Sequence, residues 1–221
     1  MCMEQEHNPK QTGTISKIEV QKKNKQRYNI YIDGDYAFAV HEDILISQRL
    51  QKGKEITASE LDVITAEEQY KKAERAAYHY LSYRPRTRKE IKDSLLRKDV
   101  EAGIVEQILD KLETEGYIND LDFALRWVSE RIQLKLKGPL VLKEELRQKG
   151  ISSRDIAEAL GQLEYEEQVD ACMRLAEKKW DQVKKRYTEK REQKHKLMMY
   201  LQRRGFSFEV IQPVIQRLEE S

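Results

Sequence analysis

The chain has 221 residues, of which 39% are hydrophobic and 36% are charged, and its 41 lysine and arginine residues nearly balance 39 aspartate and glutamate residues. A disordered chain would combine high uncompensated charge with few large apolar residues, so this composition excludes that class. Nine glycines and four prolines are too few for the regular turns of an all-β protein of this length, and helix is the expected structure.

The sequence lacks the patterns of membrane, disulfide-rich and enzymatic proteins. Its apolar runs are far shorter than the roughly 18 residues that span a bilayer, and residues 1–14 contain no signal-peptide core. The two cysteines and four isolated histidines form neither a disulfide framework nor a metal-ligand cluster, and no glycine-rich phosphate loop is present. We therefore expect a soluble cytoplasmic protein that is not an enzyme and needs no cofactor.

Strand-like alternation is confined to residues 14–40. Ile30 and Ile32 alternate with polar residues, and the Asp33-Gly34 pair that follows predicts a tight turn. These features predict a small β-hairpin or a three-stranded meander. Three short strands cannot bury a core alone, so we expect a helical segment within residues 42–50 to cover one face of the sheet.

Two capping-box patterns follow the strand region. Thr57 with Glu60, and Thr65 with Glu68, each have the spacing in which a threonine and a glutamate cap the first turn of a helix. We therefore expect helices to begin at both places. This organisation predicts a disordered tail over residues 1–13 and a small β-containing domain over residues 14–65.

A pattern of about fifty residues occurs three times in the rest of the chain. Each copy has an apolar i, i+4 pair, a basic turn, an apolar residue and then a second apolar helix, and the copies are offset by 51 and 55 residues. The corresponding turn residues are Asp99, Gly150 and Gly205. Glycine suits a left-handed residue after a helix, whereas aspartate is tolerated there at some cost. Each copy therefore contains a helix-turn-helix corner.

A longer helix precedes each of these pairs, over residues 70–82, 121–136 and 169–186. The chain is thus expected to be mainly α, with tandem three-helix repeats in an elongated array over residues 66–119, 120–164 and 165–221. Pro213 falls early in the last helix, where it removes a backbone donor, and predicts either a late helix start or a kink.

Charge alternates strongly along the repeats. Residues 71–100 carry 10 basic and 4 acidic residues, residues 101–130 carry 2 and 8, and residues 131–150 carry 6 and 2. The pattern continues with 1 and 6 in residues 151–173, and 12 and 4 in residues 174–205. Aligned basic blocks would form a stripe suited to a polyanion, although a simple match of charges to helix dipoles is the alternative explanation.

Three motifs resemble the RecX family of bacterial regulatory proteins. They are YLSYRPRTRKEI over residues 80–91, LETEGYIND over residues 112–120 followed by Phe123 and Ala124, and GPLVLKEELRQKGI over residues 138–151. Asn119 stands where an acidic residue is common in the family, and the first 65 residues resemble an extension of its longer members. Residues 116–120 also have a structural interpretation, in which Gly116 stops a helix, Tyr117 and Ile118 are apolar plugs, and the next helix is capped.

The resemblance implies a non-enzymatic modulator of the RecA recombinase that binds RecA filaments on single-stranded DNA. Such a protein would affect recombination, DNA repair and the SOS response, acting as a monomer without a membrane partner. A stand-alone DNA-binding protein with tandem helix-turn-helix units is the alternative.

Within this hypothesis, basic side chains of the repeats supply the contacts to DNA phosphate or to an acidic recombinase surface. The candidates are Arg84, Arg86, Arg88, Lys89, Arg97, Lys98, Arg131, Lys135, Lys137, Lys143, Arg147, Lys149, Arg203 and Arg204. Tyr78, Tyr80 and Tyr83 flank the first basic cluster, where they either fill the core or stack on bases.

Overall fold

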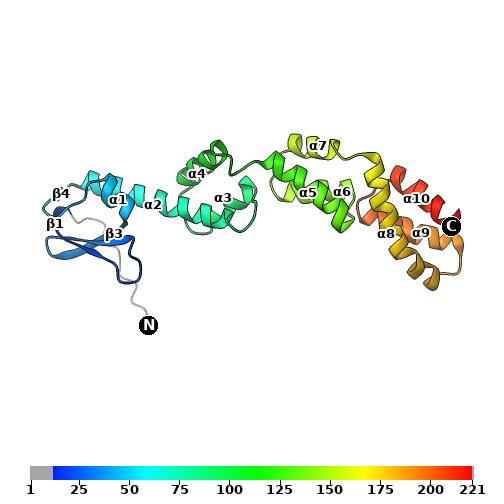
Figure 1. Ribbon diagram of the computed structural model, residues 1–221, viewed down its shortest axis with the longest axis horizontal. Coiled ribbons are helices and arrows are strands. Elements are labelled where there is room, and N and C mark those ends of the chain that lie inside the picture. The colour runs from blue at the N-terminus through cyan, green and yellow to red at the C-terminus, as the bar shows by residue number, and fades with distance from the viewer. Residues whose placement is uncertain (1–11, 221) are drawn as a thin grey trace. The chain divides into compact units, whose positions relative to one another are not determined.

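The computed structural model describes residues 12–220, which contain ten helices and four strands (Figure 1). The chain divides into two compact units, Met1–His79 with Asp99–Ile108, and Tyr80–Lys98 with Leu109–Ser221. The prediction of a mainly helical protein with a small N-terminal sheet is confirmed. The tail expected over residues 1–13 lies, up to residue 11, outside the described residues, and Gly13 already begins a strand. No helix in residues 12–220 has both the length and the apolar character of a transmembrane segment.

The sheet in the first unit is an antiparallel meander with one added strand. Its strands are β1 (Gly13–Val20), β2 (Arg27–Ile32), β3 (Asp35–His41) and β4 (Glu55–Ile56), in the order β3-β2-β1-β4. Asp33 and Gly34 have positive φ angles of 49° and 98°, as the tight turn between β2 and β3 requires. The meander is therefore confirmed, whereas β4, which has only two residues, was not predicted.

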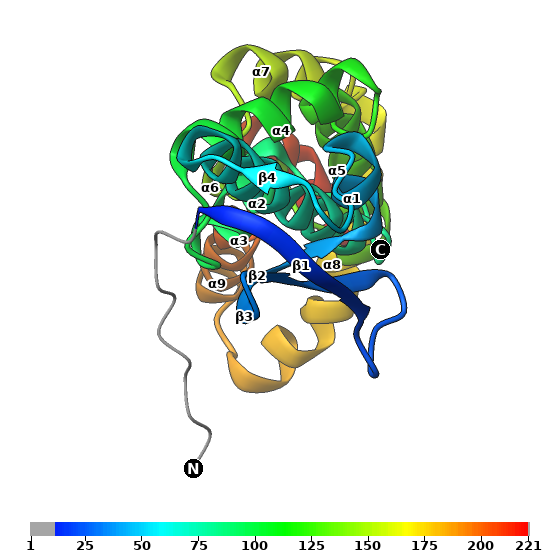
Figure 2. The ribbon, with the colours of Figure 1, turned by 90° about the vertical axis from the view of Figure 1, so that its left-hand side faces the viewer.

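The core of this unit lies between the sheet and two helices. Ile30 and Phe38 of the sheet pack with Ile44 of α1 (Glu42–Ser47) and Ile64 of α2 (Ala58–Leu81). Figures 1 and 2 show α1 and the first part of α2 on the same side of the sheet. The predicted cover by residues 42–50 is confirmed, and α2 adds to it.

The second predicted helix start, at Thr65, is wrong, because α2 runs without interruption from Ala58 to Leu81. The first start is confirmed: the Thr57 backbone N–H donates to the Glu60 carboxylate at 3.0 Å, and the Glu60 N–H donates to Thr57 Oγ1 at 3.3 Å. Glu68 instead accepts hydrogen bonds from the Arg27 guanidinium and the His41 backbone N–H, both at 2.8 Å. It therefore ties the middle of α2 to the sheet.

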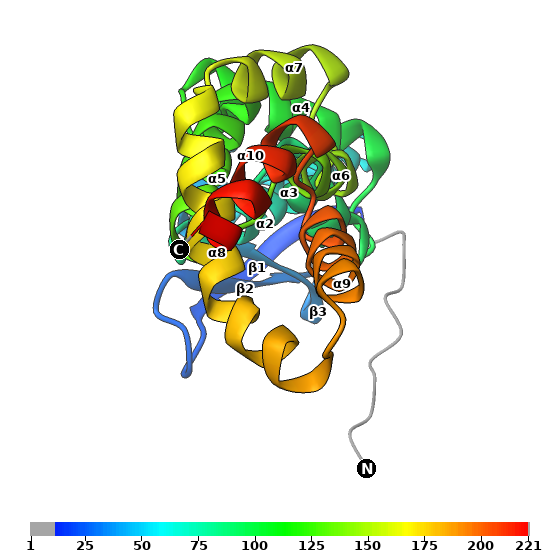
Figure 3. The same cartoon turned by 90° about the vertical axis from the view of Figure 1, so that its right-hand side faces the viewer.

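The other eight helices complete the three predicted three-helix groups. They are α3 (Arg88–Leu96), α4 (Ala102–Thr114), α5 (Asp120–Lys135), α6 (Pro139–Gln148), α7 (Ser153–Gly161), α8 (Tyr165–Arg186), α9 (Lys190–Arg203) and α10 (Phe208–Glu220). The groups are α2 to α4, α5 to α7, and α8 to α10, the last of which faces the viewer in Figure 3. Asp99, Gly150 and Gly205 have φ angles of 57°, 82° and 93°, so the left-handed turn is confirmed in all three copies.

Within the second unit, successive three-helix groups are joined by hydrogen bonds between corresponding positions of the repeat. Thr87, the N-cap of α3, donates through its hydroxyl to the backbone oxygen of Lys149, the C-cap of α6, at 2.8 Å. Gly138, the N-cap of α6, donates through its backbone N–H to the backbone oxygen of Arg204, the C-cap of α9, at 2.7 Å. Thr87 corresponds to Gly138 in the repeat, and Lys149 corresponds to Arg204. We call these two contacts the Thr87 junction and the Gly138 junction.

Backbone atoms approach closely at the Gly138 junction. A Cβ atom on Gly138 would lie 2.3 Å from the carbonyl carbon and oxygen of Gly205, and one on Gly205 would lie 2.6 Å from the Val141 nitrogen. Cβ atoms essentially never approach non-bonded backbone atoms this closely, so both positions require glycine. Leu140 extends the contact by donating its N–H to the Gly205 oxygen at 3.1 Å.

Pro213 lies inside α10, which begins at Phe208 and continues to Glu220, so a late helix start is wrong. A proline at this position cannot donate to the backbone oxygen of Glu209, four residues earlier. The Tyr165 hydroxyl donates to that oxygen instead, at 3.3 Å. A side chain from α8 thus satisfies the acceptor that Pro213 leaves open.

Replacing Pro213 with alanine is expected to raise the free energy of unfolding by about 1–2 kcal/mol, because alanine restores a helical hydrogen bond and favours the helix. Thermal unfolding followed by circular dichroism measures the change. In a Tyr165→Phe background the gain should be larger, since only alanine then supplies a donor to the Glu209 oxygen. A lower stability of the alanine variant would show that packing of the proline ring outweighs the missing bond.

Candidate functional site

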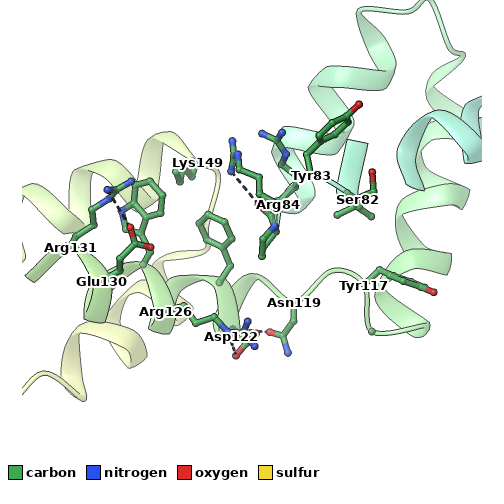
Figure 4. A pocket seen from close by; sticks show the side chains of 16 residues that line it. Ser82, Tyr83, Arg84, Tyr117, Asn119, Asp122, Arg126, Glu130, Arg131 and Lys149 are labelled. Atoms are coloured by element: carbon green, nitrogen blue, oxygen red, sulfur yellow. Dashed lines mark hydrogen bonds and ion pairs between the residues drawn. The ribbon is translucent and has the colours of Figure 1, made fainter. Parts of the chain in front are cut away.

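A groove of about 930 Å³ opens in the second unit, between the segment that precedes α3 and the exposed side of α5 (Figure 4). Its basic lining residues are Arg84, Arg86, Arg126, Arg131 and Lys149, and its acidic ones are Asp122 and Glu130. Four of these five bases were predicted as contact residues from the sequence. The structure brings together bases from two repeats that are separate in the sequence.

Arg86 is held in place on the groove wall by an aromatic ring. Its guanidinium lies 3.9 Å from the centre of the Tyr80 ring, a distance typical of a cation–π contact. Its Nε atom is buried without a hydrogen-bond acceptor. Among residues 12–220 this guanidinium has no carboxylate partner, so it is oriented in the fold without being neutralised.

The opposite wall of the groove, on α5, is built around Trp127. The Arg131 guanidinium lies 4.0 Å from the centre of its ring and the Lys149 ammonium lies 4.5 Å from it. The Trp127 indole N–H donates to Glu145 at 3.0 Å, and Phe123 stacks on the ring with a centroid separation of 5.6 Å. Trp127 therefore fixes two cations while its own polar atom is satisfied inside the fold.

Glu90 links the two walls. It accepts from Lys149 at 2.7 Å and pairs with Arg84 at 3.2 Å, and it also completes the capping box with Thr87 at the start of α3. Burial acts to raise the pKa of Glu90, but the hydrogen bonds and charges of Lys149 and Arg84 outweigh it, so the pKa lies below its usual value. Glu90 is thus held as a carboxylate that positions both bases.

The groove also contains exposed groups that were not among the basic contact residues predicted from the sequence. Tyr117 is 56% exposed, and the Arg126 side chain is 72% exposed and pairs with Asp122 at 2.9 Å. Tyr83, which was considered for stacking, is 70% exposed, and Figure 4 shows it beside Arg84. Arg126 was missed because it lies within the acidic block of residues 101–130, where averaging over the block hides a single base.

The turn before α5 corrects one structural expectation. Gly116 has a φ angle of 77° and ends α4, and Ile118 is buried as the predicted plug. Tyr117 is exposed, so its predicted role as a second plug is wrong. Asn119 caps α5 because its side-chain oxygen accepts a hydrogen bond from the Asp122 N–H at 2.9 Å. This capping contact explains structurally why an asparagine suits this position.

Several predicted contact residues are engaged inside the fold. Arg88 pairs with Asp110 and Glu113, both at 2.8 Å, and Lys137 pairs with Glu145. Arg204 donates to the backbone oxygens of Lys135 and Leu136 at the end of α5. Lys89 donates to the Gln148 oxygen at 3.0 Å. These contacts give the four side chains structural roles, and their binding to a partner stays a prediction.

A second set of predicted residues is exposed. Within the described part of the chain five of them form no ion pair, and these are Arg97, Lys98, Lys135, Lys143 and Arg203. Arg147 is exposed as well and pairs with Glu144 at 3.1 Å on its own helix. We call the five unpaired bases the free bases. Exposed charges of this kind are available to a polyanion without breaking contacts of the fold.

Comparison with known proteins gives matches along nearly the whole described chain. The family model of the regulatory protein RecX N-terminal domain matches residues 13–57. The family models of the first, second and third RecX three-helix domains match residues 73–112, 119–160 and 166–215. Regulatory protein RecX of Bacillus pumilus (strain SAFR-032) is 41% identical, over 91% of this chain and 76% of the relative. That of Bacillus subtilis (strain 168) is 39% identical, over 93% and 77%.

Two solved structures are similar. A crystal structure of regulatory protein RecX superposes with a TM-score of 0.75 at 39% identity, covering 91% of this chain and 98% of the other. A crystal structure of RecX from Lactobacillus salivarius gives a TM-score of 0.65 at 33% identity, covering 69% of this chain and 98% of the other.

Proposed function

Because the chain belongs to the RecX family of regulatory proteins, we propose that it regulates the RecA recombinase by binding RecA filaments on single-stranded DNA. The observation that carries the proposal is a set of exposed, unpaired bases on the three-helix repeats of a family member. In this role it acts as a cytoplasmic monomer in recombination, DNA repair and the SOS response. It changes the activity of the recombinase and catalyses no reaction itself.

The free bases suit a large, repetitive anionic target. Each exposed lysine or arginine contributes little affinity alone, but several on one chain bind together at high effective concentration. Bound protein would limit the growth of the recombinase filament and with it the turnover of ATP. Arg97 and Lys98, at the end of α3, are the first to test because no ion pair of the fold holds them.

The test measures ATP turnover by the recombinase on single-stranded DNA as the protein is added below stoichiometric amounts. Four free bases are replaced by alanine in one variant, namely Arg97, Lys98, Lys143 and Arg203. We expect half-inhibition to need on the order of tenfold more of this variant, because several phosphate or carboxylate contacts are lost together. Unchanged inhibition by this variant would contradict the proposed surface.

A matched control removes the same number of positive charges elsewhere. Exposed bases outside the proposed surface are replaced by alanine, namely Lys52, Lys72, Arg154 and Lys178. This variant should inhibit like the unaltered protein if position matters, and as weakly as the first variant if only net charge matters. Circular dichroism spectra of both should match that of the unaltered protein.

The alternative of a stand-alone DNA-binding protein is separated by titration at fixed salt. Binding is measured to bare duplex, bare single strand and recombinase-coated single strand. The regulator proposal expects the coated strand to bind most tightly, whereas sequence-dependent binding to bare duplex would favour the alternative. A scaffolding protein without nucleic-acid contacts would show almost no dependence on salt.

A further inference from the structure

We infer that two copies of this chain bound next to each other on a recombinase filament contact each other head to tail. The carbonyl end of α3 in one copy meets the amide end of α9 in its neighbour, and Lys98 of the first copy pairs with Glu192 of the second. The inference rests on the proposed function and adds a contact between neighbouring copies to it. Such a contact makes binding to the filament cooperative.

The two junctions within the chain follow one rule. At the Thr87 junction the carbonyl end of α6 meets the amide end of α3, and at the Gly138 junction the carbonyl end of α9 meets the amide end of α6. The second helix of a repeat thus places its carbonyl end on the second helix of the repeat before it. Among residues 12–220, the carbonyl end of α3 and the amide end of α9 enter no such junction. The chain therefore carries both halves of one further contact of the same kind.

Both of these open ends are accessible. Lys98 is exposed and its backbone oxygen accepts no hydrogen bond within residues 12–220, whereas the corresponding oxygens of Lys149 and Arg204 each accept one across a junction. Glu189, the N-cap of α9, is exposed as well, and its side chain makes no capping hydrogen bond. An acceptor at one end and the first-turn N–H donors at the other are thus available to a second copy.

The charges at the open ends repeat those of the Thr87 junction. There the Lys149 ammonium donates to Glu90, the third residue of α3, at 2.7 Å. Lys98 holds the position of Lys149 in its own repeat, and Glu192 is likewise the third residue of α9, preceded by two basic residues as Glu90 is. Glu192 is exposed and forms no ion pair in the described part of the chain. Lys98 and Glu192 of neighbouring copies can therefore form the pair that Lys149 and Glu90 form within one copy.

Helix dipoles favour a second copy over nucleic acid at the end of α3. The carbonyl end of a helix carries about half a negative charge, and the amide end carries about half a positive charge. The carbonyl end of α3 therefore attracts the amide end of another helix, as α6 and α9 do within the chain, and disfavours phosphate. The Glu192 carboxylate at the amide end of α9 then meets Lys98 directly.

The contact between copies should be weaker than the junctions within the chain. Glu189 has a Cβ atom where Gly138 has none, so the close backbone approach of the Gly138 junction is not available to α9. An exposed ion pair contributes little on its own, and free copies therefore remain monomers. Copies bound to one filament are held at a high effective concentration, which allows the contact to form. We expect a bound neighbour to raise the affinity of the next copy by about 5- to 150-fold.

The first experiment measures cooperativity with a fluorescently labelled chain titrated onto recombinase-coated single-stranded DNA. The unaltered protein should give a sigmoidal curve, and Lys98→Glu should give a curve without cooperativity. Adding Glu192→Lys to Lys98→Glu should restore cooperativity, because every contact between copies then has the same pair with its charges exchanged. A curve without cooperativity for the unaltered protein, or no restoration by the exchanged pair, would overturn the inference.

A matched control separates the ion pair from net charge. Glu158 is an exposed acid on α7 that forms no ion pair among residues 12–220. Combining Glu158→Lys with Lys98→Glu gives the same net charge as the exchanged pair but places the new base elsewhere. This variant should stay without cooperativity. Restoration by this control as well would show that only net charge matters and would also overturn the inference.

The second experiment tests the direction of the contact by cross-linking on the filament with a short bismaleimide. One chain carries Lys98→Cys and the other carries Glu192→Cys, and Cys2 is replaced by serine in both. Burial raises the pKa of Cys172 to about 12, so this thiol reacts little. A mixture of the two chains should give cross-linked dimers, whereas either chain alone should give few. Dimers from one chain alone, or none from the mixture, would contradict a head-to-tail contact.

ATP turnover by the recombinase keeps this inference separate from the proposed function. If the unaltered protein binds the filament and inhibits turnover without cooperativity or cross-linking, the inference fails and the proposed function stands. If the unaltered protein neither binds the coated strand nor inhibits, the proposed function fails and the inference fails with it. Inhibition that persists in Lys98→Glu but needs more protein, and that recovers with the exchanged pair, supports both.

Discussion

Replacing Gly138 with alanine is expected to lower the free energy of unfolding by about 3 kcal/mol. The added Cβ would lie 2.3 Å from the carbonyl group of Gly205 and 2.4 Å from the Phe206 nitrogen. These are backbone atoms and cannot rotate away as a flexible side chain would. The junction must open to relieve the overlap, which weakens the hydrogen bond from the Gly138 N–H to the Arg204 oxygen.

Thermal unfolding measures this effect, and a loss of about 3 kcal/mol corresponds to a fall in Tm of roughly 6–12 °C for a protein of this size. Gly161→Ala is the matched control, since no atom lies within 4 Å of the position its Cβ would occupy. This control should be neutral or slightly stabilising, because alanine favours a helix over glycine. Equal Tm values for the two variants would mean that the Gly138 junction is not closed in solution.

Replacing Thr87 with valine is expected to cost about 2–3 kcal/mol. Thr87 is fully buried, and its hydroxyl donates to the Lys149 oxygen at 2.8 Å and accepts from the Glu90 N–H at 3.2 Å. Valine has nearly the same shape but neither donates nor accepts, so it leaves the Lys149 oxygen and the Glu90 N–H, which are both partly buried, without these partners. The change therefore removes the cap of α3 and the Thr87 junction together.

Thr87→Ser separates the hydroxyl from the methyl group. Serine keeps both hydrogen bonds and loses only one buried methyl, at a cost of about 1 kcal/mol. Chemical denaturation of the two variants gives the comparison, and amide hydrogen exchange in α3 should be faster in the valine variant alone. If valine were tolerated as well as serine, the hydroxyl would not be holding the junction.

Much of the fold follows from local signals in the sequence. The three left-handed turn positions are predictable from the sequence because the same local pattern recurs at each of them. The pattern is an apolar i, i+4 pair, a basic turn and a following apolar residue, and it persists even where Asp99 replaces glycine. Caps such as Thr87 and Ser152 also depend on residues only three positions away. The false start at Thr65 shows the limit of such signals, because Glu68 has the spacing of a capping box but serves a contact with distant strands.

The groove depends on contacts that no local pattern reveals. Its walls come from different repeats, and Tyr117, Arg126 and Trp127 lie within the acidic block of residues 101–130, whose average charge does not indicate an anion-binding surface. Lys98, Lys149 and Arg204 hold corresponding positions in the three copies, yet only Lys98 remains a free base. Lys149 and Arg204 instead reach groups of the preceding repeat, Glu90 and the end of α5. Sequence equivalence therefore did not predict equivalent roles.

The two junctions also have an electrostatic consequence for the second helices of the repeats. The amide end of α3 meets the carbonyl end of α6, and the amide end of α6 meets the carbonyl end of α9. Opposite partial charges of about half a unit therefore face each other at both meeting points and offset one another. The carbonyl end of α3 takes part in neither meeting point, and there Arg97 and Lys98 supply the compensating positive charge while remaining open to an anionic partner.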